Sequence, residues 1–240
     1  MEEIEKLIND SLLSMKDSEY ATFQAKIIPN VDANSIIGVR TPELRKLAKD
    51  LAKKASGKAI NLNPFFERLP HAYFEEYQLH SFLIGEQKDF DACINLINAF
   101  LPYVNNWATC DQLNSSALKK NKAKLLSYID VWLASGKTYS VRFGIKMLMS
   151  YFLDDDFSVS HLQKVGAQCR PHIQNADDNY YVNMMVCWYF ATALAKQWTD
   201  SFVFIGKGNL NEWCLKKTVQ KACESFRVPE EHKAMLKQLL

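Results

Sequence analysis

The amino-acid sequence predicts an all-α protein built as an α-solenoid of stacked helical hairpins, and three observations support this. Apolar residues recur at helical spacing, and in residues 141–152 one stripe holds Val141, Ile145, Leu148, Met149 and Phe152. No segment combines sustained two-residue alternation with hairpin turn residues, so a sheet is not expected. Helix breakers recur at intervals of 32 to 35 residues, a length that fits two helices of about 12–15 residues and two short loops.

The expected helices follow this punctuation along the chain. The breakers are Gly38, Pro70, Pro102, Gly136, Pro171 and Gly206, and helical patterns cover residues 2–15, 42–55, 71–85, 90–101, 123–134, 141–152 and 216–226. One hairpin cannot bury its apolar face alone, so neighbouring hairpins must stack into a curved array with a concave surface. We therefore expect one helical-repeat domain over residues 1–240. Because the punctuation repeats but the residues do not, an irregular all-α globule is the alternative.

The clearest helix start lies at residues 41–44. Thr41 can cap the helix, Pro42 suits its first position, and Glu43 favours the positive end of the helix dipole. Arg40 then lies just before the helix N-terminus, where backbone N–H groups can also meet a phosphate.

The composition predicts a folded globular protein of the cytoplasm. Hydrophobic residues make up 48% of the 240 residues. No stretch of 18 apolar residues occurs, and the acidic start at residues 1–5 lacks the basic and apolar regions of a signal peptide. The six cysteines are scattered without a CxxC and no HExxH occurs, so we expect reduced thiols and no metal site.

The charged residues are unevenly distributed, although the formal net charge is only +2. Residues 1–20 carry six acidic and two basic side chains. Basic residues gather in three places, which are Arg40, Arg45, Lys46, Lys49, Lys53, Lys54 and Lys58, then Lys119, Lys120, Lys122 and Lys124, and finally Lys207, Lys216, Lys217, Lys221 and Arg227. Such clusters on a nearly neutral chain suit a polyanion bound on one face, and ordinary solvated helix faces are the alternative.

A tryptophan and a carboxylate lie four residues apart, at Trp107 and Asp111. On a helix this spacing places the indole and the carboxylate on one face, one turn apart. An aromatic plane beside an anion can hold a sugar or a base and stabilise a nearby positive charge. Arg142 and Trp188 follow on two later predicted helices, and the functional prediction depends on whether these four residues converge.

Five segments resemble, in order, the motifs of the AlkD-type DNA alkylation repair family. They are GVRTPELRKLAK at residues 38–49, NWATCD at 106–111, VRFGI at 141–145, YYVNMMVCW at 180–188, and QKACES at 220–225 with Arg227 and Val228. The resemblance covers residues 36–230. It implies a superhelix of HEAT-like helical repeats with a basic concave groove for duplex DNA.

The resemblance also implies an activity and a set of site residues. The activity is that of a monofunctional DNA glycosylase of base excision repair, which removes cationic N7- and N3-alkylated purines such as 7-methylguanine and 3-methyladenine. By motif position, Trp107, Asp111, Arg142 and Trp188 correspond to the catalytic cleft. The expected DNA-binding cations are Arg40, Arg45, Lys119, Lys120, Lys146, Lys216, Lys217 and Lys221. The expected partner is double-stranded DNA with alkylated bases, bound by a monomer in the bacterial cytosol or nucleoid without a cofactor, a metal or a membrane.

The chemistry of N-glycosidic cleavage explains why a single carboxylate can suffice. The reaction builds positive charge on the deoxyribose, and Asp111 is the candidate to stabilise it and to orient water. Trp107 and Trp188 could wall the sugar, and Arg142 could hold the adjacent phosphate. No general acid is assigned, but a base alkylated at N7 or N3 already carries positive charge and leaves as a neutral molecule. The site should therefore fail on uracil or hypoxanthine.

Each cleft residue also has a purely structural alternative. The alternatives are Trp107 as a core aromatic, Asp111 as a surface charge or the partner of a lysine such as Lys119, Arg142 with Lys146 on a solvated helix face, and Trp188 as a core residue. Tyr180, Tyr181 and Asn183 either support the cleft or pack inside the protein. Glycosylases of the family carry a basic residue within a turn after the helix tryptophan, whereas here the next cation is Lys196, which predicts a weaker grip on phosphate.

Two other functions compete with the glycosylase, because a fold does not fix a function. One is non-catalytic binding of duplex or branched DNA on the same scaffold. The other is a helical-repeat module for protein interaction, which would lack the salt dependence that phosphate neutralisation gives to DNA binding.

Overall fold

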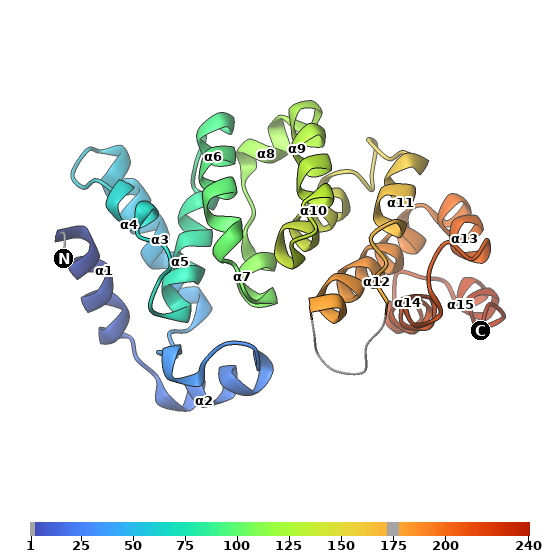
Figure 1. The fold of residues 1–240 in the computed structure, drawn as a ribbon, viewed down its shortest axis with the longest axis horizontal. Helices are drawn as coiled ribbons and strands as arrows, with labels where there is room; N and C mark the ends of the chain where they lie inside the picture. The colour runs from blue at the N-terminus through green and yellow to red at the C-terminus, as the bar shows by residue number, and fades with distance from the viewer. Residues whose placement is uncertain (1–2, 172–177) are drawn as a thin grey trace. The chain divides into compact units, whose positions relative to one another are not determined.

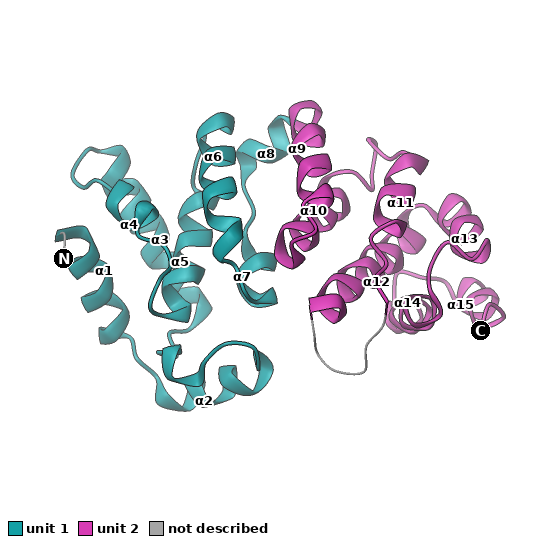
Figure 2. Cartoon of the chain, in the orientation of Figure 1, with its two compact units in different colours: residues 1–121 teal, residues 122–240 magenta. Residues whose placement is uncertain are grey.

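The computed structural model describes residues 3–171 and 178–240, and within them the chain is helical without any strand (Figure 1). The chain divides into two compact units, residues 1–121 and residues 122–240 (Figure 2). The first unit holds α1 (Glu3–Ser14), α2 (Ser18–Ile27), α3 (Thr41–Ser56), α4 (Asn63–Glu67), α5 (Phe74–Gly85), α6 (Phe90–Phe100), α7 (Trp107–Gln112) and α8 (Ser116–Lys120), with short 3-10 turns η1 (Ala33–Ser35) and η2 (Leu101–Tyr103). The second holds α9 (Lys122–Ala134), α10 (Thr138–Tyr151), α11 (Val159–Gly166), α12 (Asp178–Lys196), α13 (Trp198–Gly206), α14 (Glu212–Glu224) and α15 (Glu230–Lys237).

The predicted punctuation matches the observed helical hairpins in every interval but one. Among the described residues, two α-helices lie between successive breakers from Gly38 to Pro102 and from Gly136 to Gly206. Three α-helices, α7, α8 and α9, lie between Pro102 and Gly136. The prediction of an all-α chain of helical repeats is therefore confirmed, whereas a single domain over residues 1–240 and a basic concave face stay predictions.

The predicted cap of α3 and the predicted starts of three other helices are wrong. Two of these three, at residues 71–85 and 141–152, begin instead at Phe74 and Thr138. Arg40, not Thr41, is the N-cap of α3, because its extended backbone turns its carbonyl toward the N–H groups of Glu43 and Leu44, at 2.9 and 3.1 Å. Thr41 is thus the first helical residue, and no side chain caps α3. The last predicted helix, at residues 216–226, begins earlier, at Glu212, where the side chain of Asn211 accepts the N–H of Cys214.

The first helices of successive hairpins lie side by side and run in the same direction. In the second unit the rings of Tyr180 on α12 and Trp213 on α14 are 6.0 Å apart. Eight residues farther along both helices, the Lys221 ammonium lies 5.6 Å from the Trp188 ring. The residue numbers rise together across this interface, so α12 and α14 are parallel, and α12 packs along α10 on its other side. Parallel stacking of equivalent helices is the geometry of a repeat array.

The first unit uses the same arrangement for α3 and α5. Glu75 at the start of α5 binds the backbone at Gly38 just before α3, and Arg45 on α3 lies over the ring of Phe82 on α5. Helix α5 then packs against α7, so α7 belongs to the next layer of the stack. All ten residues from Glu75 to Ile84 except Tyr77 are buried, which makes α5 the centre of this unit.

A buried histidine pair lies inside the first unit. Nε2 of His71 and Nδ1 of His80 are 2.8 Å apart, and the two rings stack on Phe65 and Phe100, with centroid distances of 4.7 and 4.1 Å. Burial lowers the pKa of His71 to about 4 and that of His80 to about 2. Both histidines are therefore neutral at pH 7.

We expect the protein to lose stability as the pH falls from about 6.5 to about 4. The unfolded chain takes up protons near the ordinary histidine pKa of about 6.5, while the folded pair resists them, so the stability present above pH 6.5 is lost toward the folded pKa values. The loss for the pair should reach about 2–4 kcal/mol at pH 5. Thermal unfolding from pH 7.5 to 4.5 should show a flatter pH dependence for the His71→Gln/His80→Gln variant, and equal slopes would contradict the assignment.

Three remaining features are the state of the cysteines, the potential metal ligands and the apolar length of the helices. All six cysteines are free thiols, of which Cys169 and Cys223 are half-buried and the others buried. No group of three or more His, Cys, Asp or Glu side chains in residues 3–171 and 178–240 is placed to bind a metal ion. None of the helices in these ranges is long and apolar enough to cross a membrane.

Candidate functional site

Helix α7 carries the tryptophan and the carboxylate of the predicted cleft. Asn106 is buried and its side chain accepts the N–H of Thr109 at 2.8 Å, which caps the helix. Trp107 and Asp111 follow one turn apart, and both side chains are half-buried. The predicted placement of the pair on one helix is therefore confirmed, while its catalytic role stays a prediction.

Trp107 is both anchored and partly exposed. Its indole N–H donates to the carbonyl of Ile27 at 3.3 Å, which ties α7 to the end of α2. Its ring packs on a buried cluster formed by Ile28, Ile36, Phe74 and Ala108. One side of the indole thus belongs to the core, as the structural alternative proposed, and the remainder is open to a ligand.

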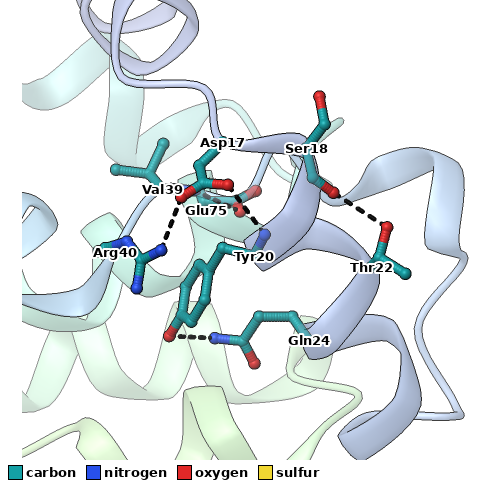
Figure 3. A network of polar contacts seen from close by, with 8 residues as sticks. All are labelled: Asp17, Ser18, Tyr20, Thr22, Gln24, Val39, Arg40 and Glu75. Atoms are coloured by element: carbon teal, nitrogen blue, oxygen red, sulfur yellow. Dashed lines mark hydrogen bonds and ion pairs between the residues drawn. The ribbon is translucent and has the colours of Figure 1, made fainter.

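Arg40 belongs to a polar network at the start of α2 (Figure 3). Its guanidinium pairs with Asp17 at 2.8 Å and lies 4.8 Å above the ring of Tyr20, whose hydroxyl accepts a hydrogen bond from Gln24. The backbone N–H of Tyr20 and the Arg40 guanidinium lower the pKa of Asp17. More than half of the Arg40 side chain is exposed, so a phosphate can compete with Asp17 for the guanidinium.

Glu75 fixes the loop that leads from this network into α3. The Glu75 carboxylate is 1% exposed and accepts the backbone N–H groups of Ile37, Gly38 and Val39 at 2.9, 2.6 and 3.2 Å. Burial raises the pKa of Glu75, while the three N–H groups act in the opposite direction. The start of α3, and with it Arg40, is therefore held by a carboxylate of the neighbouring repeat.

The other predicted cations of the first unit differ in their surroundings. Arg45 is exposed on α3, yet its guanidinium donates to the side chain of Gln112 at 2.8 Å and stacks 4.2 Å from the centroid of Phe82. Lys119 and Lys120 are exposed in the last turn of α8. These two lysines lie where a surface contact with a polyanion is possible.

Arg142 and Lys146 are buried on α10, with 4% and 5% of their surfaces exposed. Arg142 donates to the backbone carbonyl of Tyr181 at 2.6 Å, and the Lys146 ammonium lies 5.8 Å from the ring of Phe143. The alternative of a solvated helix face is therefore wrong for both residues. Their contact with DNA stays a prediction, which their burial does not favour.

Trp188 is exposed, with 47% of its surface accessible. From Tyr181 to Leu194 all residues of α12 are buried except Met184, Trp188 and Thr192, which recur every four residues and form one narrow stripe. The alternative of a core position is wrong, because Trp188 lies on that stripe. The Lys221 ammonium lies 5.6 Å from the indole centroid, so the cation that the sequence lacks after Trp188 is supplied by α14.

The remaining predicted residues of the second unit have partners inside the protein. Lys216 pairs with Glu212 at 2.6 Å, and half-buried Lys217 donates to Gln220 at 2.8 Å. Asn183 is fully buried and exchanges two hydrogen bonds with the backbone of Arg170, at 2.9 and 3.0 Å. Asn183 is thus a packing residue.

Lys196, the next cation along α12 after Trp188, pairs with Asp154 at 2.7 Å. Tyr181 is buried, and Tyr180 packs edge-on against it at 5.4 Å.

The four cleft residues are divided between the two units. Trp107 and Asp111 belong to the first unit, and Arg142 and Trp188 belong to the second. The convergence of all four, which the sequence predicts, therefore stays a prediction. Trp107 in the first unit is half-buried, and in the second unit Trp188 is the exposed tryptophan, while Trp198 and Trp213 are half-buried.

A family model described as DNA alkylation repair enzyme matches residues 8–178, which is most of the chain. The chain belongs to this family. The match includes Trp107, Asp111 and Arg142 and ends before Trp188. No curated protein matches the chain. The substrate of a DNA alkylation repair enzyme is DNA. Its phosphates and bases are therefore the groups that the exposed basic side chains and the exposed indole of Trp188 are suited to contact.

Sequence reasoning missed the glutamines that hold α7. Gln112 and Gln78 link Arg45 to Thr109 through consecutive hydrogen bonds, although neither glutamine belongs to a motif. Gln112 directly follows Asp111, which is the one signal that could have indicated a role. Gln78 is only 2% exposed in the middle of α5, where an apolar residue is expected.

We expect Trp188→Ala to weaken DNA binding and to leave the protein stable. Base–aromatic stacking contributes about 1–3 kcal/mol, and an exposed indole contributes little to folding. Trp132→Ala, in the same unit, is the control, because Trp132 is 3% exposed and its truncation should cost about 3–5 kcal/mol of unfolding free energy. A drop in melting temperature as large for Trp188→Ala as for Trp132→Ala would contradict the assignment.

Proposed function

We propose that this DNA alkylation repair enzyme is a monofunctional DNA glycosylase that releases cationic N7- and N3-alkylated purines from duplex DNA. The observation that carries the proposal is the pair Trp107 and Asp111, half-buried one turn apart on a helix that is fixed at several points. An indole and a carboxylate at this spacing suit a deoxyribose that acquires positive charge. No cofactor is required, and the proposed place of action is the chromosome in the cytoplasm.

In this mechanism the protein supplies charge and position, while the lesion supplies the leaving group. Asp111 stabilises the oxocarbenium-like sugar and orients the attacking water. Trp107 covers one face of the sugar, and Trp188 with Lys221 supplies a separate DNA contact from the second unit. The alkylated base departs as a neutral molecule, so no second acid is needed.

The test compares two leaving groups in the same duplex. One oligonucleotide carries a single 7-methylguanine and a matched one carries a single uracil, and the released bases are measured by chromatography. We expect release of 7-methylguanine alone, because uracil is neutral and leaves only as an anion or after protonation. Efficient release of uracil would contradict the one-carboxylate mechanism.

Binding without base excision is the second candidate, and exposed Trp188 with half-buried Lys221 beside it favours it, because a contact of these two residues with DNA does not require Asp111. A duplex affinity that falls steeply with salt is expected for both candidates. Base release from the 7-methylguanine duplex separates them.

A further inference from the structure

Helix α7 is too short to determine its own geometry. It has six residues, and isolated helices of fewer than about 12 residues are marginal in water. Its position must therefore come from contacts with other elements. Asn106 caps its first turn and Trp107 binds the carbonyl of Ile27, so the start of the helix is fixed. The part that carries Asp111 needs a separate anchor.

A directional chain of hydrogen bonds supplies that anchor. Arg45 Nη2 donates to Gln112 Oε1 at 2.8 Å, Gln112 Nε2 donates to Gln78 Oε1 at 2.8 Å, and Gln78 Nε2 donates to Thr109 Oγ1 at 2.9 Å. The hydroxyl of Ser81 also donates to the carbonyl of Thr109, at 3.3 Å. The chain thus reaches α7 at Thr109 and at Gln112, on both sides of Asp111.

The direction of the chain is set at Arg45. A guanidinium has only donors, so the amide of Gln112 must present its oxygen to Arg45 and its nitrogen to Gln78. Gln78 must then present its own nitrogen to Thr109. Gln78 is 2% exposed, so neither of its bonds can be replaced by bulk water. Stacking on Phe82 at 4.2 Å fixes the plane of the guanidinium that begins the chain.

We propose that Arg45, Gln112 and Gln78 form a positioning relay for α7. Arg45 positions Asp111 through Gln112. A contact with phosphate alone does not account for this role. The effect on base release rests on the glycosylase function proposed above. A displacement of about 1 Å at a reacting group can cost about 100-fold in rate, so loss of the relay should slow the reaction while DNA still binds.

The relay distinguishes arginine from lysine, and this gives the test. Arg45→Lys keeps the positive charge that a phosphate contact needs, but it loses the planar stacked fork. Gln78→Met keeps the volume of the buried side chain and removes both of its hydrogen bonds. Arg68→Lys is the matched control, because Arg68 is an exposed arginine of the same unit that pairs with Glu5 at 3.4 Å.

The measurements separate positioning from binding and from activity. One is the ¹⁹F NMR resonance of Trp107 in protein labelled with 5-fluorotryptophan, assigned by Trp107→Phe among the five tryptophans. The others are the affinity for duplex DNA and the single-turnover release of 7-methylguanine. We expect Arg45→Lys and Gln78→Met to shift or broaden the Trp107 resonance, to leave the affinity within about twofold, and to lower the rate about 10- to 100-fold. Arg68→Lys should match the wild type in all three.

The outcomes that overturn the relay are independent of the glycosylase function. An unchanged Trp107 resonance in both variants would show that α7 does not depend on the chain. Loss of affinity in Arg45→Lys with an unchanged resonance would make Arg45 a direct DNA contact that needs the guanidinium fork, and not a positioning residue. If the wild type releases no base, the proposed function fails, and the Trp107 resonance still decides the relay. Should Gln78→Met fail to fold, Arg45→Lys carries the test, because its side chain is at the surface.

Discussion

Asp111→Asn should lower the release of 7-methylguanine by about 10²–10³-fold and leave the affinity for duplex DNA unchanged. Asparagine keeps the size of the side chain and its ability to accept a hydrogen bond, so α7 should keep its structure. It removes the negative charge that stabilises the developing positive charge on the sugar. The expected change is therefore in the single-turnover rate and not in the binding step.

The control for Asp111→Asn is Asp91→Asn, which removes an exposed carboxylate from the first turn of α6 in the same unit. Its rate and affinity should match those of the wild type. Equal base release by wild type and Asp111→Asn would remove Asp111 from the mechanism. If the affinity for duplex DNA fell by the same factor as the rate, Asp111 would instead be required for the structure of the DNA-binding surface.

The sequence predicted the repeat architecture because its punctuation carries the repeat length. The same length then appears in the tertiary contacts, since a residue meets its counterpart in the next hairpin about one repeat later. Gly38 and Glu75 are 37 residues apart, Gln78 and Gln112 are 34 apart, and Arg142 and Tyr181 are 39 apart. This offset could have predicted which helices touch, although the side chains that meet are not repeated.

Exposure within α12 could not be predicted from periodicity. Helix α12 packs against α10 and α14, so most of its surface is buried and only one narrow stripe is open. That stripe holds Met184, Trp188 and Thr192, of which only Thr192 is polar, while polar Asn183 is buried. The hydrophobic pattern therefore has no polar side, and Trp188 looks like a core residue.

The candidate site was predicted best where its residues are adjacent in sequence. The spacing of Trp107 and Asp111 places both on α7, and the structure confirms this placement. The burial of Arg142 and the approach of Lys221 to Trp188 depend on neighbouring repeats, which the sequence of one helix does not specify. The same holds for the relay through Gln78, since a buried glutamine has no periodic signature.

Gly38→Ala should lower the free energy of unfolding by about 4 kcal/mol, the largest effect that we expect of a single methyl group in this protein. Gly38 has a φ of +93°, and a Cβ there would lie 2.0 Å from the carbonyl oxygen of Asp17 and 2.8 Å from the backbone nitrogen of Ala21. Both are backbone atoms at the start of α2, where Asp17 is the N-cap, so no flexible side chain can move aside to relieve the contact. A loss of this size corresponds to roughly 8–16 °C in melting temperature.

The clash also threatens the bonds that hold the start of α3. A shift of Gly38 that relieves the clash also disturbs its hydrogen bond to Glu75, in which the N···O distance is 2.6 Å, and a buried carboxylate that loses a donor is destabilising. Gly136→Ala separates this effect from backbone strain, because Gly136 has a φ of +69° with nothing within 4 Å of the added Cβ. Gly136→Ala should cost only the roughly 1–2 kcal/mol of a left-handed alanine, so equal losses in the two variants would show that the close approach of α2 contributes nothing.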